Sequence, residues 1–287
     1  MKLSPFCFGC EPLGGTDWGN IEINDIAEAI NTGLELGVNF FDTGGVYGLG
    51  LSEERLSNIL GKRRHDVVIA TKGGLSWTNT SSKRGTITKD SSVKKIRQDI
   101  ESSLRRLRLE TLPIFYVHWP DENTKIEDTF FELSKIKDEG KINSIGCSNF
   151  TAEQIEKACT VSKVDYIQTP LSILTGSLNS DISEICSRKN IKVIAYNVLM
   201  SGLLTGKFNL NSTFPKNDRR SRLPLFMGEE FKSALKKVDE LKLKATKCNQ
   251  SLSTYSINWA LKEDNVSSVV IGIKNSKQMK DNWIKNS

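Results

Sequence analysis

The sequence predicts an α/β fold, a (β/α)8 or TIM barrel whose site lies at the C-terminal ends of its strands. Apolar, β-branched runs recur with helical segments between them, which is typical of β-α-β units and a parallel sheet. Eight such runs fit within 287 residues, and no Gly/Ser/Pro-rich linker divides them. Strand number and length both match this barrel, so we expect one domain over residues 1–287. The alternative, an open doubly wound sheet, requires a G-x-G-x-x-G after the first strand, and the sequence has none there.

Four strands and four helices are expected in the first half of the chain. The helix at residues 25–36 places Ile26, Ala29 and Ile30 on one face, and Asn24 can cap it. The third strand is followed by a long polar loop in which residues 78–84 are almost free of apolar side chains. The expected strands are 5–10, 38–42, 67–72 and 113–118, and the expected helices begin at 25, 52, 90 and 125.

The second half continues the same alternation. Gly140 ends the helix at residues 125–139. The longest irregular segment, residues 201–227, carries the basic run Arg219, Arg220 and Arg222. The expected strands are 142–148, 164–168, 191–197 and 267–273, and the expected helices are 151–161, 180–188, 229–246, 251–261 and 276–284.

Composition excludes several functional classes. With 38% hydrophobic and 26% charged residues, the chain resembles a soluble globular protein, and no apolar run approaches the ~20 residues of a membrane span. Six scattered cysteines and the absence of a signal-peptide pattern favour the cytoplasm. Cys7 and Cys10 form a C-x-x-C without a second pair or a nearby histidine, so we expect packing residues and no metal site. A net charge of +6 is no argument for nucleic acid. The oligomeric state stays open, and a monomer is compatible with the sequence.

Polar side chains follow the predicted strands at the end where barrel enzymes carry their chemistry. Asp42, Lys72 and His118 each close an apolar run, and Tyr47 follows Asp42 in a Gly-rich loop. A cation beside a phenol lowers its pKa, so Lys72 can activate Tyr47 as an acid, with Asp42 fixing Lys72 and His118 orienting a carbonyl oxygen. Such a set protonates a carbonyl while another group delivers hydride. The structural alternative is a buried salt bridge beside a core histidine.

The hydride must come from a cofactor, because the sequence shows no redox group of its own. Ser148, Asn149 and Gln168 can hold a carboxamide, and the ring of Tyr196 can stack on a nicotinamide. The phosphates can be contacted by cations, for which the candidates are Lys207, Arg220 and Lys274. The end of the eighth strand at Gly272 and the helix after it together form a further anion site.

Four longer motifs resemble one family. FFDTGGVYGLGLSEERLSNIL, VVIATKGGL, FYVHWPDENTKIEDTFFELSKIKDEGKINSIGCSNF and YNVLMSGLLTGKF are similar to the aldo-keto reductase superfamily, especially its bacterial general-stress and inositol-operon branch. The resemblance implies a catalytic tetrad of Asp42, Tyr47, Lys72 and His118. It implies NADPH as cofactor, with NADH as the alternative because Lys274 stands where the family usually has arginine. The cofactor-binding residues it implies are Ser148, Asn149, Gln168, Tyr196, Leu199, Ser201, Gly202, Leu204, Lys207, Arg220, Gly272, Lys274, Gln278 and Asn282.

The expected activity is NADP-dependent reduction of a small-molecule aldehyde or ketone, including sugars and their derivatives, with no nucleic-acid or membrane partner. Trp18, Trp77 and Trp119 on the rim loops are candidates for an aromatic substrate wall. Two alternatives stay open. A barrel lyase or aldolase would use Lys72 as a Schiff base. A non-catalytic subunit would hold NADPH and regulate a partner, as potassium-channel β subunits of the same superfamily do.

Overall fold

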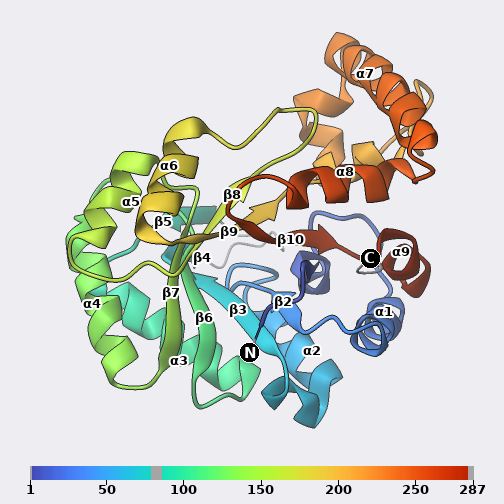
Figure 1. The fold of residues 1–287 in the computed structure, drawn as a ribbon. Helices are drawn as coiled ribbons and strands as arrows, with labels where there is room; N and C mark the ends of the chain where they lie inside the picture. The colour runs from blue at the N-terminus through green and yellow to red at the C-terminus, as the bar shows by residue number, and fades with distance from the viewer. Residues whose placement is uncertain (1, 79–85, 284–287) are drawn as a thin grey trace.

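Eight parallel strands close into a barrel in this computed structural model, which describes residues 2–78 and 86–283 (Figure 1). The strands follow one another around the barrel in the order β1, β10, β9, β8, β7, β6, β3, β2. The predicted TIM barrel is therefore confirmed. The strands are β1 (Phe6–Gly9), β2 (Phe40–Asp42), β3 (Val68–Gly73), β6 (Leu112–Val117), β7 (Ile142–Ser148), β8 (Tyr166–Pro170), β9 (Lys192–Tyr196) and β10 (Val266–Gly272).

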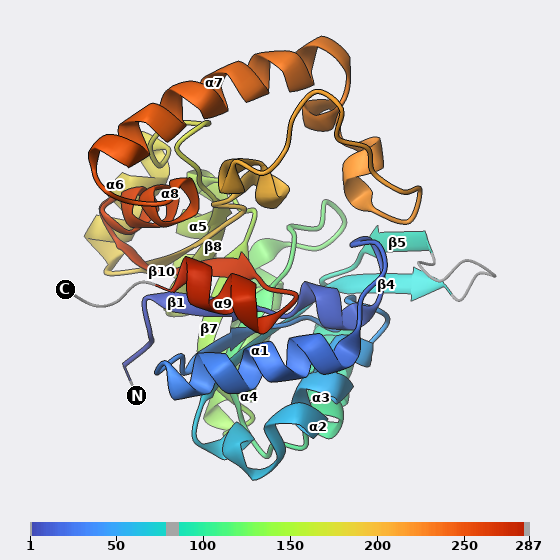
Figure 2. The same cartoon turned by 90° about the vertical axis from the view of Figure 1, so that its right-hand side faces the viewer.

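Helices surround the barrel, and α1 packs against α9 where β1 pairs with β10 (Figure 2). Ser92 caps α3, and Thr151 forms a capping box with Gln154 at the start of α5. The expected Asn24 cap is wrong, because α1 begins two residues earlier than expected, at Ile23, and has no side-chain cap. The helices are α1 (Ile23–Glu35), α2 (Leu51–Leu60), α3 (Val93–Leu107), α4 (Ile126–Asp138), α5 (Ala152–Cys159), α6 (Ser180–Lys189), α7 (Gly228–Lys247), α8 (Leu252–Leu261) and α9 (Ser276–Asn282).

The core has two layers because successive strand residues face opposite sides of the sheet. Phe8 and Phe41 pack outward beneath the helices, whereas Phe40 and Tyr116 fill the barrel. Gly146 is required beside Tyr116, since a Cβ there would lie 2.4 Å from the tyrosine ring. Cys7 and Cys10 are buried, free thiols on the two sides of β1, as expected of packing residues.

Two short strands, together called the hairpin below, lie on either side of residues 79–85 in the segment where a polar loop was expected. β4 (Leu75–Thr78) and β5 (Thr86–Lys89) pair antiparallel, with Leu75 opposite Lys89 and Trp77 opposite Ile87. Leu75 and Trp77 alternate with polar residues as in a strand, but two apolar residues are too few to predict a strand from the sequence. Residues 78–84 were expected to be almost free of apolar side chains. Of these, Thr78 is described, and residues 79–84 lie outside the described residues. The hairpin forms a sheet of its own at the rim of the barrel (Figure 2).

The 201–227 segment is built from short 3₁₀ helices and an aromatic cluster. Phe226 lies 5.2 Å from Phe214 and 5.8 Å from both Phe208 and Phe231, measured between ring centroids. The 3₁₀ helices of the chain are η1 (Glu11–Gly14), η2 (Gly61–His65), η3 (Met200–Thr205), η4 (Arg219–Arg222) and η5 (Pro224–Phe226). In the part of the chain that is described, no helix combines the length and apolar character needed to cross a membrane.

Candidate active site

A cavity of about 1340 Å³ opens at the C-terminal ends of the barrel strands. The 201–227 segment bounds it on one side and the β4–β5 hairpin on another. The predicted site residues that line it are Trp18, Asp42, Tyr47, His118, Trp119, Ser148, Asn149, Gln168, Tyr196, Leu199, Ser201, Gly202, Lys207, Arg220, Gly272, Lys274, Gln278 and Asn282. Lys72 is 1% exposed and contacts Tyr47 from below the cavity surface.

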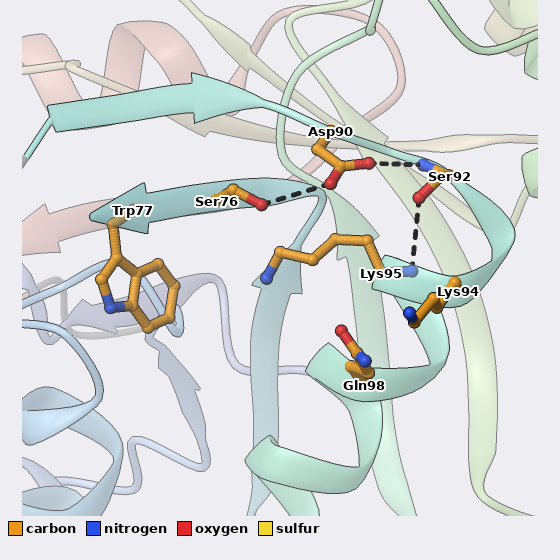
Figure 3. A pocket seen from close by; sticks show the side chains of 7 residues that line it. All are labelled: Ser76, Trp77, Asp90, Ser92, Lys94, Lys95 and Gln98. Atoms are coloured by element: carbon orange, nitrogen blue, oxygen red, sulfur yellow. Dashed lines mark hydrogen bonds between the residues drawn. The ribbon is translucent and has the colours of Figure 1, made fainter. Parts of the chain in front are cut away.

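Besides Lys72, two predicted residues do not line this cavity, Leu204 and Trp77. Leu204 is fully buried in the core, consistent with the packing of an apolar side chain. Trp77 lies beside a separate depression of about 350 Å³, with Lys95 5.1 Å from its ring centroid (Figure 3). Pairing within the hairpin directs the indole there, so Trp77 does not line the main cavity, where the substrate wall was expected.

A buried ion pair links Asp42, the last residue of β2, with Lys72, the second-last residue of β3. The Nζ of Lys72 lies 2.5 Å from Oδ1 of Asp42 and also donates to the carbonyl oxygen of Thr43 at 2.8 Å. The same Nζ lies 3.3 Å from the hydroxyl of Tyr47. His118 contacts Tyr47 edge to face, with ring centroids 5.8 Å apart. The four residues of the expected tetrad therefore lie together.

Tight backbone turns position Tyr47. The amide of Tyr47 donates to the carbonyl of Gly44, and the amide of Gly45 donates to the carbonyl of Lys72 at 3.3 Å. Gly48 has a φ of +63°, and a Cβ on it would lie 2.2 Å from the carbonyl oxygen of Gly14. The Gly-rich loop thus serves to fold Tyr47 back over Lys72.

The ionisation of these groups follows from burial and from the charge of Lys72. Burial raises the pKa of Tyr47, and this outweighs the opposing effect of Lys72, so the phenol is protonated at neutral pH. Burial disfavours the charge on Lys72, but Asp42 and Tyr47 hold its pKa above that of an ordinary lysine. Burial and the charge of Lys72 lower the pKa of His118 well below its usual range, which leaves the imidazole neutral. The net upward shift of the pKa of Tyr47 differs from the lowering that the sequence suggested. Tyr47 is partly buried in the cavity wall, and there the loss of hydration outweighs the charge of Lys72.

The expected carboxamide-binding residues also contact the tetrad. The side-chain amide of Gln168 donates to Oδ2 of Asp42 at 2.7 Å, an orientation that follows because a carboxylate can only accept. The Asn149 amide donates to the carbonyl of His118 at 3.0 Å, and its side-chain oxygen accepts from the Tyr196 hydroxyl at 2.7 Å. These links were not predicted, since they join strands far apart in the sequence.

Cations gather at the other end of the cavity. Arg220 donates from Nε to Asp218 at 2.8 Å, and Nζ of Lys274 donates to the carbonyl of Trp18 at 2.5 Å. Burial lowers the pKa of Lys207 and of Lys274, and the nearby charge of Arg220 lowers both further. A bound anion would offset the repulsion between these cations and raise the pKa of both lysines again.

The lining therefore fits a nicotinamide dinucleotide. Amides and a hydroxyl at Ser148, Asn149 and Gln168 suit a carboxamide, and the half-buried Tyr196 presents a flat ring. The cation cluster suits phosphates. Among the described residues, no group of histidine, cysteine and acidic side chains could hold a metal ion.

Sequence reasoning missed the contribution of the hairpin to the cavity wall. Leu75, Ile87 and Lys89 line the cavity beside Trp119, and Nζ of Lys89 lies 5.3 Å from the ring centroid of Trp119. Glu11 and Arg219 also line the cavity, with Oε1 of Glu11 3.4 Å from Nη1 of Arg219. The ends of the eight barrel strands do not identify such residues, because they lie in the hairpin and in the 3₁₀ helices η1 and η4.

Fold and site together define a barrel oxidoreductase, and comparison with known proteins gives its family. The model of the aldo/keto reductase family matches residues 5–285. The aldo-keto reductase YhdN of Bacillus subtilis is 30% identical over 282 residues, covering 97% of this chain and 84% of that protein. An NADH-specific methylglyoxal reductase of Escherichia coli is 28% identical over 292 residues, covering 98% and 88%.

A solved structure gives the same result. The glycerol dehydrogenase AKR11B4 from Gluconobacter oxydans superimposes with a TM-score of 0.87 at 34% identity, covering 99% of this chain and 87% of that one. The chain belongs to the aldo/keto reductase family and is an oxidoreductase.

Proposed function

We propose that the protein reduces an aldehyde or ketone to an alcohol with NADPH, and that Tyr47 is the general acid. The observation that carries the proposal is the contact of 3.3 Å between the Tyr47 hydroxyl and Nζ of Lys72, next to a neutral His118 in the cavity wall. The six free cysteines support a location in the reducing cytoplasm.

The chain itself supplies the proton and the positioning. When bound, the nicotinamide cofactor supplies hydride. Tyr47, protonated at neutral pH, gives its proton to the carbonyl oxygen, and the ammonium of Lys72 stabilises the phenolate that remains. Asp42 keeps Lys72 charged. The neutral imidazole of His118 can donate one hydrogen bond to the same carbonyl oxygen and orient it.

The residues proposed to hold the cofactor divide between the two ends of the cavity. Ser148, Asn149 and Gln168 would bind the carboxamide, and Tyr196 would stack on the ring. Lys207 and Lys274 would contact phosphates, and this role is supported by the lowered pKa of both ammonium groups. We also propose that Lys274 favours NADPH over NADH by attracting the additional phosphate.

A Schiff-base lyase is less well supported. Such chemistry requires an unprotonated, accessible amine. The amine of Lys72 is buried and charged, with Asp42, Thr43 and Tyr47 around it. Nothing specific in the described residues favours a non-catalytic regulatory subunit, and the experiment below distinguishes it from an enzyme.

The test is a fluorescence titration with NADPH and NADH, followed by steady-state rates on a carbonyl panel that includes methylglyoxal, with glycerol for the reverse reaction. We expect turnover by the wild type and none by Tyr47→Phe, with NADPH binding retained in both. Lys274→Met should weaken NADPH binding more than NADH binding. Retained activity in Tyr47→Phe would refute the assignment of the acid. Binding without turnover over the whole panel would instead favour the regulatory subunit.

A further inference from the structure

A second buried ion pair lies beneath the tetrad, and the proposed mechanism does not use it. Glu53, in the first turn of α2, is completely buried. Its Oε2 accepts from Nε of Arg106 on α3 at 2.5 Å, and its Oε1 accepts from the hydroxyl of Thr71 on β3 at 2.5 Å. One carboxylate therefore joins α2, α3 and β3.

Each partner of Glu53 lies next to a tetrad residue. Thr71 directly precedes Lys72 in β3. The side chain of Arg106 packs against the Tyr47 loop at two glycines. A Cβ on Gly50 would lie 2.8 Å from Cδ of Arg106, and one on Gly45 would lie 3.2 Å from Nη2. The ion pair thus contacts the segment that carries the acid and the strand that carries its cation.

Stability alone does not explain a buried charge pair here. Desolvation of two ions offsets most of their attraction, so apolar residues of the same volume are often as stable. Apolar side chains would lack the directional bonds that Glu53 makes at both oxygens. These bonds join the start of α2, just after the loop, to β3 and α3. They add to the ties that the loop makes through Lys72, which bonds Thr43 and Tyr47, and through Ser52, which contacts Thr43 at 2.9 Å.

We propose that Glu53 is a positioning residue of the reaction, which holds the Tyr47 loop in register with Lys72 through Arg106 and Thr71. The inference rests on the proposed function of Tyr47. In that function, Lys72 must stay within hydrogen-bond reach of Tyr47 to stabilise the phenolate. The 3.3 Å between the Tyr47 hydroxyl and Nζ of Lys72 is already at the long end of a hydrogen bond, so a further shift of the loop would weaken this stabilisation. A displacement of about 1 Å can reduce the rate ~100-fold.

The test uses Glu53→Gln, which preserves shape but removes the charge that pairs with Arg106 and leaves one NH₂ group to face either Arg106 or the hydroxyl of Thr71. Glu132→Gln is the matched control. Glu132 is also a buried glutamate, 6% exposed, and it also pairs with an arginine of α3, Arg97, but on the α4 side away from the cavity. We expect kcat to fall about 10- to 100-fold in Glu53→Gln at temperatures where both variants are folded. The Kd for NADPH should stay within about twofold, and Glu132→Gln should retain the wild-type kcat.

Two further measurements separate positioning from loss of folding. Arg106→Lys keeps the charge and should recover part of kcat relative to Arg106→Met. A crystal structure of Glu53→Gln should show a longer distance from the Tyr47 hydroxyl to Nζ of Lys72 than in the wild type. An unchanged distance, or a kcat that falls equally in Glu53→Gln and Glu132→Gln, would overturn the proposal. If the wild type reduces no carbonyl, the proposed function fails, and the distance alone then decides the positioning role.

Discussion

Replacing Asp42 by asparagine tests the electrostatic account of the site most directly. The substitution preserves the shape of the side chain and removes its charge. Lys72 is then left buried, with the Thr43 carbonyl at 2.8 Å, the Tyr47 hydroxyl at 3.3 Å and the new amide oxygen as acceptors. The new NH₂ group faces the side-chain amide of Gln168, which must rotate to avoid pairing two donors.

The expected cost follows from these contacts. Breaking a buried ion pair at one partner destabilises a protein by about 3–5 kcal/mol. The three remaining acceptors of Lys72 put this site at the lower end, about 3 kcal/mol. At roughly 2–4 °C per kcal/mol, Tm should fall by about 6–12 °C. The pKa of Lys72 should also fall, since burial then acts without Asp42 to oppose it.

The measurement is calorimetric unfolding of Asp42→Asn and the wild type without cofactor at pH 7. At that pH the contribution of Lys72 is fully present. Its folded pKa is raised, so the stabilisation holds below the unfolded value of about 10.4 and is lost as pH rises through the folded pKa. Glu156→Gln, which breaks an exposed pair with Arg188, should leave Tm nearly unchanged.

A double variant sharpens the result. Asp42→Asn with Lys72→Met leaves no unpaired charge, so it should recover most of the lost Tm while remaining inactive. A shift of less than about 2 °C in Asp42→Asn would refute the reasoning. So would a double variant that is no more stable than the single one.

Two further predictions concern His118 and the tryptophans. Because the pKa of His118 is lowered in the folded state, its neutral form contributes stability above about pH 6.5 that is lost as pH falls below that value. Urea unfolding between pH 7 and 5 should therefore show a weaker acid dependence for His118→Asn than for the wild type, and equal slopes would contradict the shift. Trp119→Ala should raise KM for the carbonyl about tenfold, equivalent to ~1.4 kcal/mol of lost contact, and leave the Kd for NADPH unchanged. Trp77→Ala, outside the cavity, should leave both constants unchanged, and a raised KM would show that Trp77 contacts substrate.

The barrel could be predicted because its signal is repeated. Each strand is an apolar run, and parallel strands of a barrel carry their C-terminal ends to one rim, so Asp42, Lys72 and His118 could be brought together before any geometry was known. Tyr47 follows Asp42 so closely that its loop must lie on the same rim. These residues lie at one rim because all eight strands run in the same direction.

Features set by side-chain packing could not be predicted in this way. Glu53 and Arg106 are both charged residues within helices, and sequence alone suggests an exposed face for each. The upward shift of the pKa of Tyr47 depends on how much of its hydration the surrounding cavity wall removes, which no local sequence pattern encodes. The sequence predicts Trp77 in the substrate wall because its segment lies at the rim of the barrel. The pairing of β4 with β5 instead directs the side chain to the separate depression beside Lys95.

The β4–β5 hairpin lines the cavity without belonging to the barrel sheet, so the two parts can change independently in evolution. β3 pairs directly with β6, so the barrel's hydrogen bonds do not pass through the hairpin. The tetrad comes from the barrel strands and the 43–50 loop, whereas Leu75, Ile87 and Lys89 line the cavity from the hairpin. If the proposed function holds, mutations in the hairpin can therefore change which carbonyl compounds are accepted while the barrel and the proposed proton donor, Tyr47, are inherited unchanged. Substrate range is free to diverge between descendants faster than the chemistry does.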